Sequence, residues 1–182
     1  MLEIEIPRTE IWDNENEMFS YVDSCKLVLE HSLISISKWE SKWNKPFLTR
    51  DEKTPEEMID YVKCMTINRV DSAVFSCLTT ENYKKINYYI AAPMTATTFR
   101  ENGGAPKGNR EIMTAEVIYF YMISFGIPFE CEKWHINRLL TLIRVCSIKN
   151  SPSKKMSKSA AAKHQRALNA QRRAKAHSKG GR

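Results

Sequence analysis

The side chains best suited to chemistry are a cysteine and a histidine in the last apolar stretch of the chain. Cys131 and His135 lie four residues apart, so on the helix predicted there they share one face. Such a pair could act as a thiol–imidazole couple or supply half of a metal site. On a strongly apolar helix, however, a free cysteine and a hydrogen-bonded histidine more often belong to the core. The pair therefore predicts neither a catalytic site nor a metal site.

Two further groups invite a chemical interpretation and fail to support one. Glu56 and Glu57 are adjacent carboxylates, but they occupy the first turn of a predicted helix, where acidic groups stabilise the helix dipole. Residues 93–109 are rich in glycine and contain Lys107, yet a phosphate-binding loop needs its lysine after the last glycine and a strand before it. Here Lys107 precedes Gly108 and no buried strand leads in. We expect a non-enzymatic protein without a cofactor.

Charge divides the chain into two parts. Residues 1–150 carry 18 basic and 21 acidic groups, whereas residues 151–182 carry ten Lys or Arg and no acidic residue. This predicts a single globular domain over 1–150 and a basic C-terminal extension over 151–182, either flexible or helical. The extension could bind nucleic acid in a salt-sensitive way, dock on an acidic protein surface, or keep the chain soluble. Its candidate cations are Lys154, Lys155, Lys158, Lys163, Arg166, Arg172, Arg173 and Lys175.

Cysteine usage and hydropathy favour a protein of the cytosol. The five cysteines are an odd number and form no CxxC pair, so neither a disulfide framework nor a zinc site is predicted. The N-terminus alternates acidic and apolar residues, which is not the pattern of a signal peptide. No apolar run approaches the roughly 20 residues that a membrane-spanning helix needs. We expect no membrane association.

The first 30 residues predict β-structure. Leu2, Ile4 and Ile6 alternate with glutamates, which is the period of a half-buried strand that ends at Pro7. Residues 18–22 and 26–29 are short apolar runs separated by Asp23, Ser24 and Cys25, and this pattern predicts a hairpin. Residues 12–15 fall in the connection that precedes it. A small antiparallel sheet of two or three strands follows from this pattern.

From residue 31 onward the apolar period changes to that of helices. The pattern predicts helices over 31–44, 54–67 and 80–92, with a helical turn at 71–77. The second helix begins with a capping box in which Thr54 is the N-cap and Glu57 is at N3. The fold class is therefore mainly α, with a small N-terminal antiparallel β-hairpin region.

Residues 111–150 predict an αα-hairpin around which the rest of the chain is arranged. Its first helix has Ile112, Ala115, Tyr119, Met122 and Ile123 at helical spacing. Its second helix is predicted from Cys131 through Trp134, Arg138, Leu142 and Ile143. Gly126 between them suits a helix C-terminus, where the backbone adopts a left-handed conformation.

Several of these stretches together resemble one family. They are 29–48 (LEHSLISISKWESKWNKPFL), 57–66 (EMIDYVKCMT), 92–99 (APMTATTF), 112–122 and 127–150 (IPFECEKWHINRLLTLIRVCSIKN). These stretches resemble small tail-morphogenesis proteins of tailed bacteriophages, and most of all the tail assembly chaperones encoded beside the tape-measure gene. The resemblance covers most of residues 27–150.

The resemblance implies a non-enzymatic helical protein of the infected host's cytoplasm. Such chaperones coat the long, aggregation-prone tape-measure protein until the tail tube polymerises around it, so the implied partners are the tape-measure protein and other tail proteins, with a homo-oligomer also compatible. Methionine and aromatic residues on helices supply adaptable contacts of this kind, although the same residues also suit a core. The candidate contact residues are Trp39, Trp43, Tyr88, Tyr89, Tyr119 and Met122.

Two other functions remain open at this stage. One is a virion structural protein, a head–tail or tail component that stays in the particle. The other is a DNA-associated packaging protein that acts through residues 154–182 and binds more weakly as salt rises.

Overall fold

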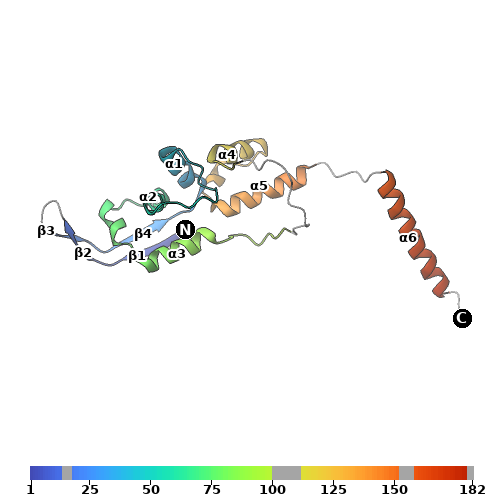
Figure 1. Cartoon of the computed structure of the whole chain (residues 1–182), viewed down its shortest axis with the longest axis horizontal. Coiled ribbons are helices and arrows are strands. Elements are labelled where there is room, and N and C mark those ends of the chain that lie inside the picture. Colours follow the sequence, from blue (N-terminus) through green and yellow to red (C-terminus); the bar gives the residue numbers. More distant parts are fainter. Residues whose placement is uncertain (14–17, 100–111, 152–157, 180–182) are drawn as a thin grey trace. The chain divides into compact units, whose positions relative to one another are not determined.

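The computed structural model describes residues 1–13, 18–99, 112–151 and 158–179, and they form a mainly α-helical protein, as the sequence predicts (Figure 1). The chain separates into two compact units, Met1–Ile148 and Lys149–Arg182. The first contains most of the elements and the second contains the C-terminal helix. In chain order the elements are β1 (Leu2–Ile6), β2 (Thr9–Asp13), β3 (Met18–Val22), β4 (Cys25–Leu29), α1 (Leu33–Trp43), α2 (Pro55–Met65), η1 (Ser72–Cys77), α3 (Thr80–Ala91), α4 (Ala115–Ser124), η2 (Phe129–Lys133), α5 (Ile136–Asn150) and α6 (Lys158–Lys179).

The N-terminal strands pair differently from the prediction. β1 pairs with β4 and β2 pairs with β3, both antiparallel. The predicted hairpin of residues 18–22 with 26–29 is therefore wrong, because β3 and β4 follow each other along one arm of a longer ribbon. Pro7 interrupts the first arm, and Asp23 and Ser24 interrupt the second at the same level, so both arms break together. Trp12, which was predicted in a connection, belongs to β2.

The sheet of β1 and β4 has one core face and one exposed face. Ile4 and Ile6 of β1 and Leu27 and Leu29 of β4 are buried, whereas the glutamates of β1 are exposed. Because successive side chains of a strand point to opposite faces, the alternation in LEIEI puts every apolar side chain of β1 on the core side. The predicted half-buried strand over residues 2–6 is confirmed.

Helix α1 lies at the centre of the first unit. It packs against α2, α4 and η2, and it buries Leu33, Ile36 and Trp39. Ser32 caps its N-terminus by accepting a hydrogen bond from the Ser35 backbone, and Asn44 ends it in a left-handed conformation with φ 53°. The hub of the fold is thus α1 rather than the predicted αα-hairpin.

The start of α2 follows the sequence prediction closely. The Thr54 side chain accepts from the Glu57 backbone N–H, and the Glu57 carboxylate accepts from the Thr54 backbone N–H at 2.8 Å. Pro55 occupies the first turn, where no backbone donor is needed. This capping box is confirmed because its determinants are all local in sequence.

The αα-hairpin is only partly as predicted. Gly126 has φ 63° after α4, as expected of a glycine at a helix end. The second helix, however, begins at Ile136 instead of Cys131, and residues 129–133 form the separate turn η2. The reason is tertiary: the Ile136 backbone N–H donates to the His31 carbonyl at 2.8 Å, and Ser32 forms a β-bridge with His135. These contacts hold the chain extended where the sequence pattern predicts helix.

Candidate partner-binding surfaces

Three of the six candidate contact residues lie in the core, and for Trp39 and Met122 this corrects their assignment as contacts. Trp39, Tyr89 and Met122 are buried. The Trp39 indole N–H donates to the Glu57 carbonyl at 2.9 Å, so its polar atom is satisfied inside the protein. All three side chains belong to the hydrophobic core. Burial excludes Trp39 and Met122 from direct contact with a partner, whereas Tyr89, 6% exposed, also lines an open groove beside α3.

The other three candidates have different degrees of access. Trp43 is half-buried and its indole N–H donates to Asp60 Oδ2 at 2.9 Å. Tyr119 is half-buried and its hydroxyl donates to Glu132 Oε2 at 2.9 Å; burial and this hydrogen bond raise the pKa of Tyr119 to about 12. Tyr88 is 82% exposed. Tyr88 is therefore the candidate that the structure leaves fully accessible.

The largest apolar side chains that α4 exposes were not among the predicted contacts. Helix α4 buries Ala115, Ile118 and Met122, and its opposite face leaves Phe120 and Ile123 each 64% exposed. Phe129 of η2 is 56% exposed, and its ring centroid lies 6.4 Å from that of Tyr119. We call Tyr119, Phe120, Ile123 and Phe129 together the α4 surface.

A sequence signal for the α4 surface exists. The helix sequence AEVIYFYMIS contains one charged residue, Glu116, so apolar side chains surround it on every side. A helix that is apolar all round but contacts the core along one stripe must expose the remainder or bury it against a partner. Exposed apolar surface of this kind often marks an interaction site.

A second exposed aromatic group lies on the ribbon of β2 and β3. Trp12 and Phe19 face each other across the strands with ring centroids 4.8 Å apart, and the Arg8 guanidinium lies 4.9 Å from the Tyr21 ring centroid. All three aromatic side chains are exposed. A two-stranded ribbon is marginally stable in water, so contact with another surface would stabilise it.

The basic extension forms helix α6. Lys163, Arg166, Arg172 and Arg173 are exposed on it, and Lys158 and Lys175 belong to the same helix. Lys154 and Lys155 lie outside the described residues. Because the described part of α6 offers no apolar stripe, its interactions with other molecules would be mainly electrostatic.

The two histidines that could do chemistry belong to a buried, internally satisfied cluster. His31 Nδ1 is hydrogen-bonded to the Tyr61 hydroxyl, and its ring centroid lies 4.9 Å from that of His135. His135 Nε2 donates to the Tyr89 carbonyl at 3.0 Å. Burial, and then the charge of His135, lower the pKa of His31 to about 3. Both rings are neutral parts of the core. Cys131 is buried in η2 and His135 precedes α5, so the two residues do not share a helix face.

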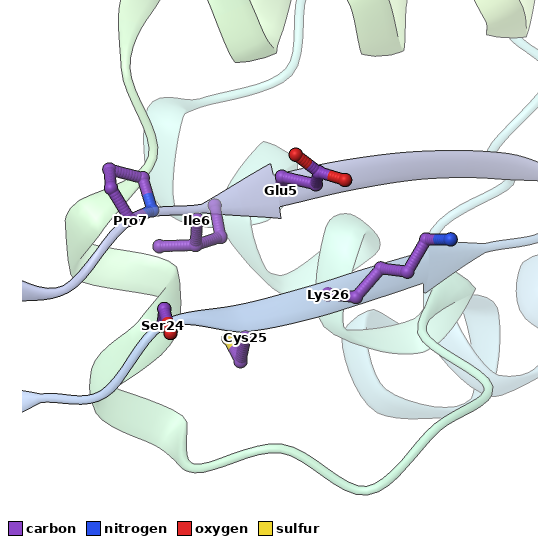
Figure 2. Close-up of a pocket in the computed structure, with 6 residues that line it drawn as sticks. All are labelled: Glu5, Ile6, Pro7, Ser24, Cys25 and Lys26. Atoms are coloured by element: carbon purple, nitrogen blue, oxygen red, sulfur yellow. The ribbon is translucent and has the colours of Figure 1, made fainter.

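A hollow at the ends of β1 and β4 offers no activated nucleophile. Glu5, Ile6 and Pro7 line it from one arm of the ribbon, and Ser24, Cys25 and Lys26 line it from the other (Figure 2). Burial, and then the charge of Cys77, raise the pKa of the Cys25 thiol, which favours the unreactive protonated form. Across the described ranges, no three His, Cys, Asp or Glu side chains come together as a metal site would need.

No helix in the described part of the chain is both long and apolar enough to cross a bilayer. Comparisons with known protein families, with curated proteins and with solved structures find no match.

Proposed function

We propose that this protein is a non-enzymatic tail-morphogenesis protein of a tailed bacteriophage, a tail assembly chaperone that binds the tape-measure protein in the host cytoplasm. The observation that carries the proposal is the α4 surface, where Phe120 and Ile123 are exposed on α4 and the exposed Phe129 lies against Tyr119 of the same helix. The resemblance of residues 27–150 to such chaperones supplies the identity of the partner. The surface supplies the means of binding.

The α4 surface suits a partner that exposes apolar segments. Aromatic side chains bury large areas and lose little conformational entropy on binding, so they dominate the free energy of many interfaces. Transfer of apolar area from water contributes about 25 cal/mol per Å², and this contribution persists at high salt. Binding through the α4 surface should therefore be resistant to salt, whereas binding through α6 should not.

The test is co-expression with the tape-measure protein encoded beside this gene, followed by pull-down in about 50 mM and about 500 mM salt. We expect soluble, stoichiometric, salt-resistant recovery. The double substitution Phe120→Ser and Ile123→Ser should abolish recovery. Ile67→Ser is the matched control, because Ile67 is also an exposed isoleucine, at 55%, and lies in a different segment.

Other results would redirect the proposal. Recovery at low salt alone would favour electrostatic binding through α6. Detection of the protein in purified virions would favour a structural component of the head–tail or tail region, since a chaperone is released. A DNA-associated packaging role predicts DNA affinity that is lost on truncation after Asn150, and unchanged affinity after that truncation would exclude it.

A further inference from the structure

The two edges of the β1–β4 sheet differ in whether their outward backbone N–H and C=O groups have hydrogen-bond partners. On the β4 side, the Val28 backbone N–H donates to Asn68 Oδ1 at 2.9 Å and the Val28 carbonyl accepts from the Ile67 N–H at 3.0 Å. The Asn68 amide also donates to the Lys26 carbonyl at 2.7 Å. Residues 67 and 68 therefore satisfy both outward backbone groups of Val28 and the outward carbonyl of Lys26, and they close this edge over Val28.

The same contacts fix the direction of the backbone groups on β1. Glu3 lies opposite Val28 and Glu5 lies opposite Lys26. In an antiparallel pair, directly opposite residues both point toward each other's backbone or both point away. Because Val28 and Lys26 bond outward to residues 67 and 68, the N–H and C=O groups of Glu3 and Glu5 point outward on the other side.

The outer edge of β1 is open within the described part of the chain. There, β1 pairs with β4 alone, and no recorded hydrogen bond joins the Glu3 or Glu5 backbone to another element. Figure 2 shows β1 with a strand on one side only. The side chains of both glutamates are exposed on the solvent face of the sheet, next to this edge. An unpaired row of backbone donors and acceptors is a template for another strand.

An apolar groove adjoins the start of this edge. Helix α3 packs against β1. Between them lies an open groove of about 430 Å³, lined by Leu2, Lys84, Lys85, Tyr88, Tyr89, Ala92 and Met94. Leu2, Ile4 and Ile6 lie on the core face of β1, so alternate side chains of an added strand would lie on the same side, toward α3.

We propose that the open edge of β1 and the α3 groove bind an extended segment of a partner protein by β-strand addition. The segment would have apolar residues at alternate positions, facing the groove, and a basic residue beside Glu5, since Glu3 already forms an ion pair with Lys26 of β4. Main-chain hydrogen bonds would supply affinity and the alternating side chains would supply selectivity. This site is separate from the α4 surface and does not require the partner to be the tape-measure protein.

A second copy of this chain is a poor occupant of the edge. Antiparallel pairing of β1 with another β1 would bring the exposed glutamates of LEIEI close to one another across the strands, and the single Lys26, which forms an ion pair with Glu3, offsets only one of the two charges on each chain. Like charges facing each other across strands are destabilising, so self-pairing is disfavoured. A basic partner strand has the opposite effect.

The experiment uses the full chain and a library of random ten-residue peptides, followed by titration of one selected peptide. Glu5→Pro removes the outward N–H of β1 but leaves the hydrogen bonds to β4, because proline is tolerated where the N–H faces away from the ladder. Glu5→Gln is the matched control that keeps the backbone and removes the charge. We expect the selected peptides to have apolar residues at every second position. Relative to the unsubstituted protein, the titrated peptide should bind Glu5→Pro at least about tenfold more weakly, and its affinity for Glu5→Gln should change by about threefold or less.

A second measurement does not depend on folding of the proline variant. The selected peptide is N-methylated either at amides that face β1 or at the alternate amides, and each form is titrated into the unsubstituted protein. Only the first form should lose affinity, and hydrogen exchange at the Glu3 and Glu5 amides should slow when the parent peptide binds. The proposal would be overturned if no peptide were selected, or if the apolar residues of the selected peptides had a helical period or no period. It would also be overturned if both N-methylated forms of the peptide bound equally well.

Discussion

Glu40 should be one of the most sensitive positions in the fold, because one buried carboxylate joins three segments. Its Oε1 accepts from the Phe47 backbone N–H at 2.7 Å, and its Oε2 accepts from the Ala115 backbone N–H at 2.7 Å. The side chain is buried on α1. Glu40 therefore connects α1 both to the segment that follows it and to the first turn of α4, which bears the α4 surface.

The substitution Glu40→Gln isolates this contribution with little change in volume. A glutamine has one acceptor oxygen, so it keeps one of the two hydrogen bonds and presents its NH2 group to the other N–H. Loss of a hydrogen bond to a charged group costs about 1.5–3 kcal/mol and burial of an unpaired donor costs about 1–3 kcal/mol, but these costs overlap. We expect the free energy of unfolding to fall by about 2–4 kcal/mol, a large part of the 5–15 kcal/mol typical of a domain.

The assay is urea unfolding followed by circular dichroism, with hydrogen exchange at the Ala115 and Phe47 amides as the local readout. Glu116→Gln is the control, since this exposed glutamate in the first turn of α4 should contribute below about 1 kcal/mol through the helix dipole. If Glu40→Gln and Glu116→Gln gave equal losses, or if exchange at Ala115 did not accelerate, Glu40 would not join α1 to α4 as described.

Three further predictions concern the first unit. The pKa of His31 is about 3 in the folded protein, against 6.5 in an unfolded chain, so the stabilisation that neutral His31 provides is fully present above pH 6.5 and is lost as the pH falls toward 3. The free energy of unfolding should be about 2 kcal/mol lower at pH 5 than at pH 7. A free energy of unfolding that does not change between these pH values would contradict this prediction. Thr54→Ala removes the N-cap of α2 and should cost about 1 kcal/mol in urea unfolding, whereas Thr54→Ser should cost less. Asn68→Ala should lower stability by about 1–2 kcal/mol and speed exchange of the Val28 amide specifically; unchanged exchange there would show that Asn68 does not close the β4 edge.

Local sequence rules predicted the parts of the fold that local interactions determine. The capping box at Thr54 and Glu57 and the left-handed Gly126 each depend on residues within a few positions. The same rules misplaced the hairpin, because Asp23 and Ser24 have turn chemistry but occupy a break within one arm of the ribbon. They also could not show that a bridge to Ser32 keeps His135 out of α5.

The candidate contacts that proved to be buried were misassigned for a related reason. Where apolar residues surround a helix, as on α4, the period of hydrophobicity does not identify the buried stripe, so Met122 was as plausible a contact as Phe120. Only the packing of α1 against α4 in the structure shows that Met122 is buried and Phe120 is exposed. The hydrogen bond from the Val28 N–H to Asn68 is likewise not indicated by any local pattern, because the two residues are 40 positions apart in sequence.

The two proposed surfaces depend on different interactions, and this makes their roles separable. The α4 surface acts through side chains, so Phe120→Ser and Ile123→Ser should affect it without affecting the β1 edge. The β1 edge acts through its backbone, so Glu5→Pro should have the converse effect. If both surfaces hold one long partner, each substitution weakens the binding of that same partner, because it removes the gain in effective concentration that the second contact provides. If each surface holds its own partner, each substitution weakens the binding of one partner and leaves that of the other unchanged.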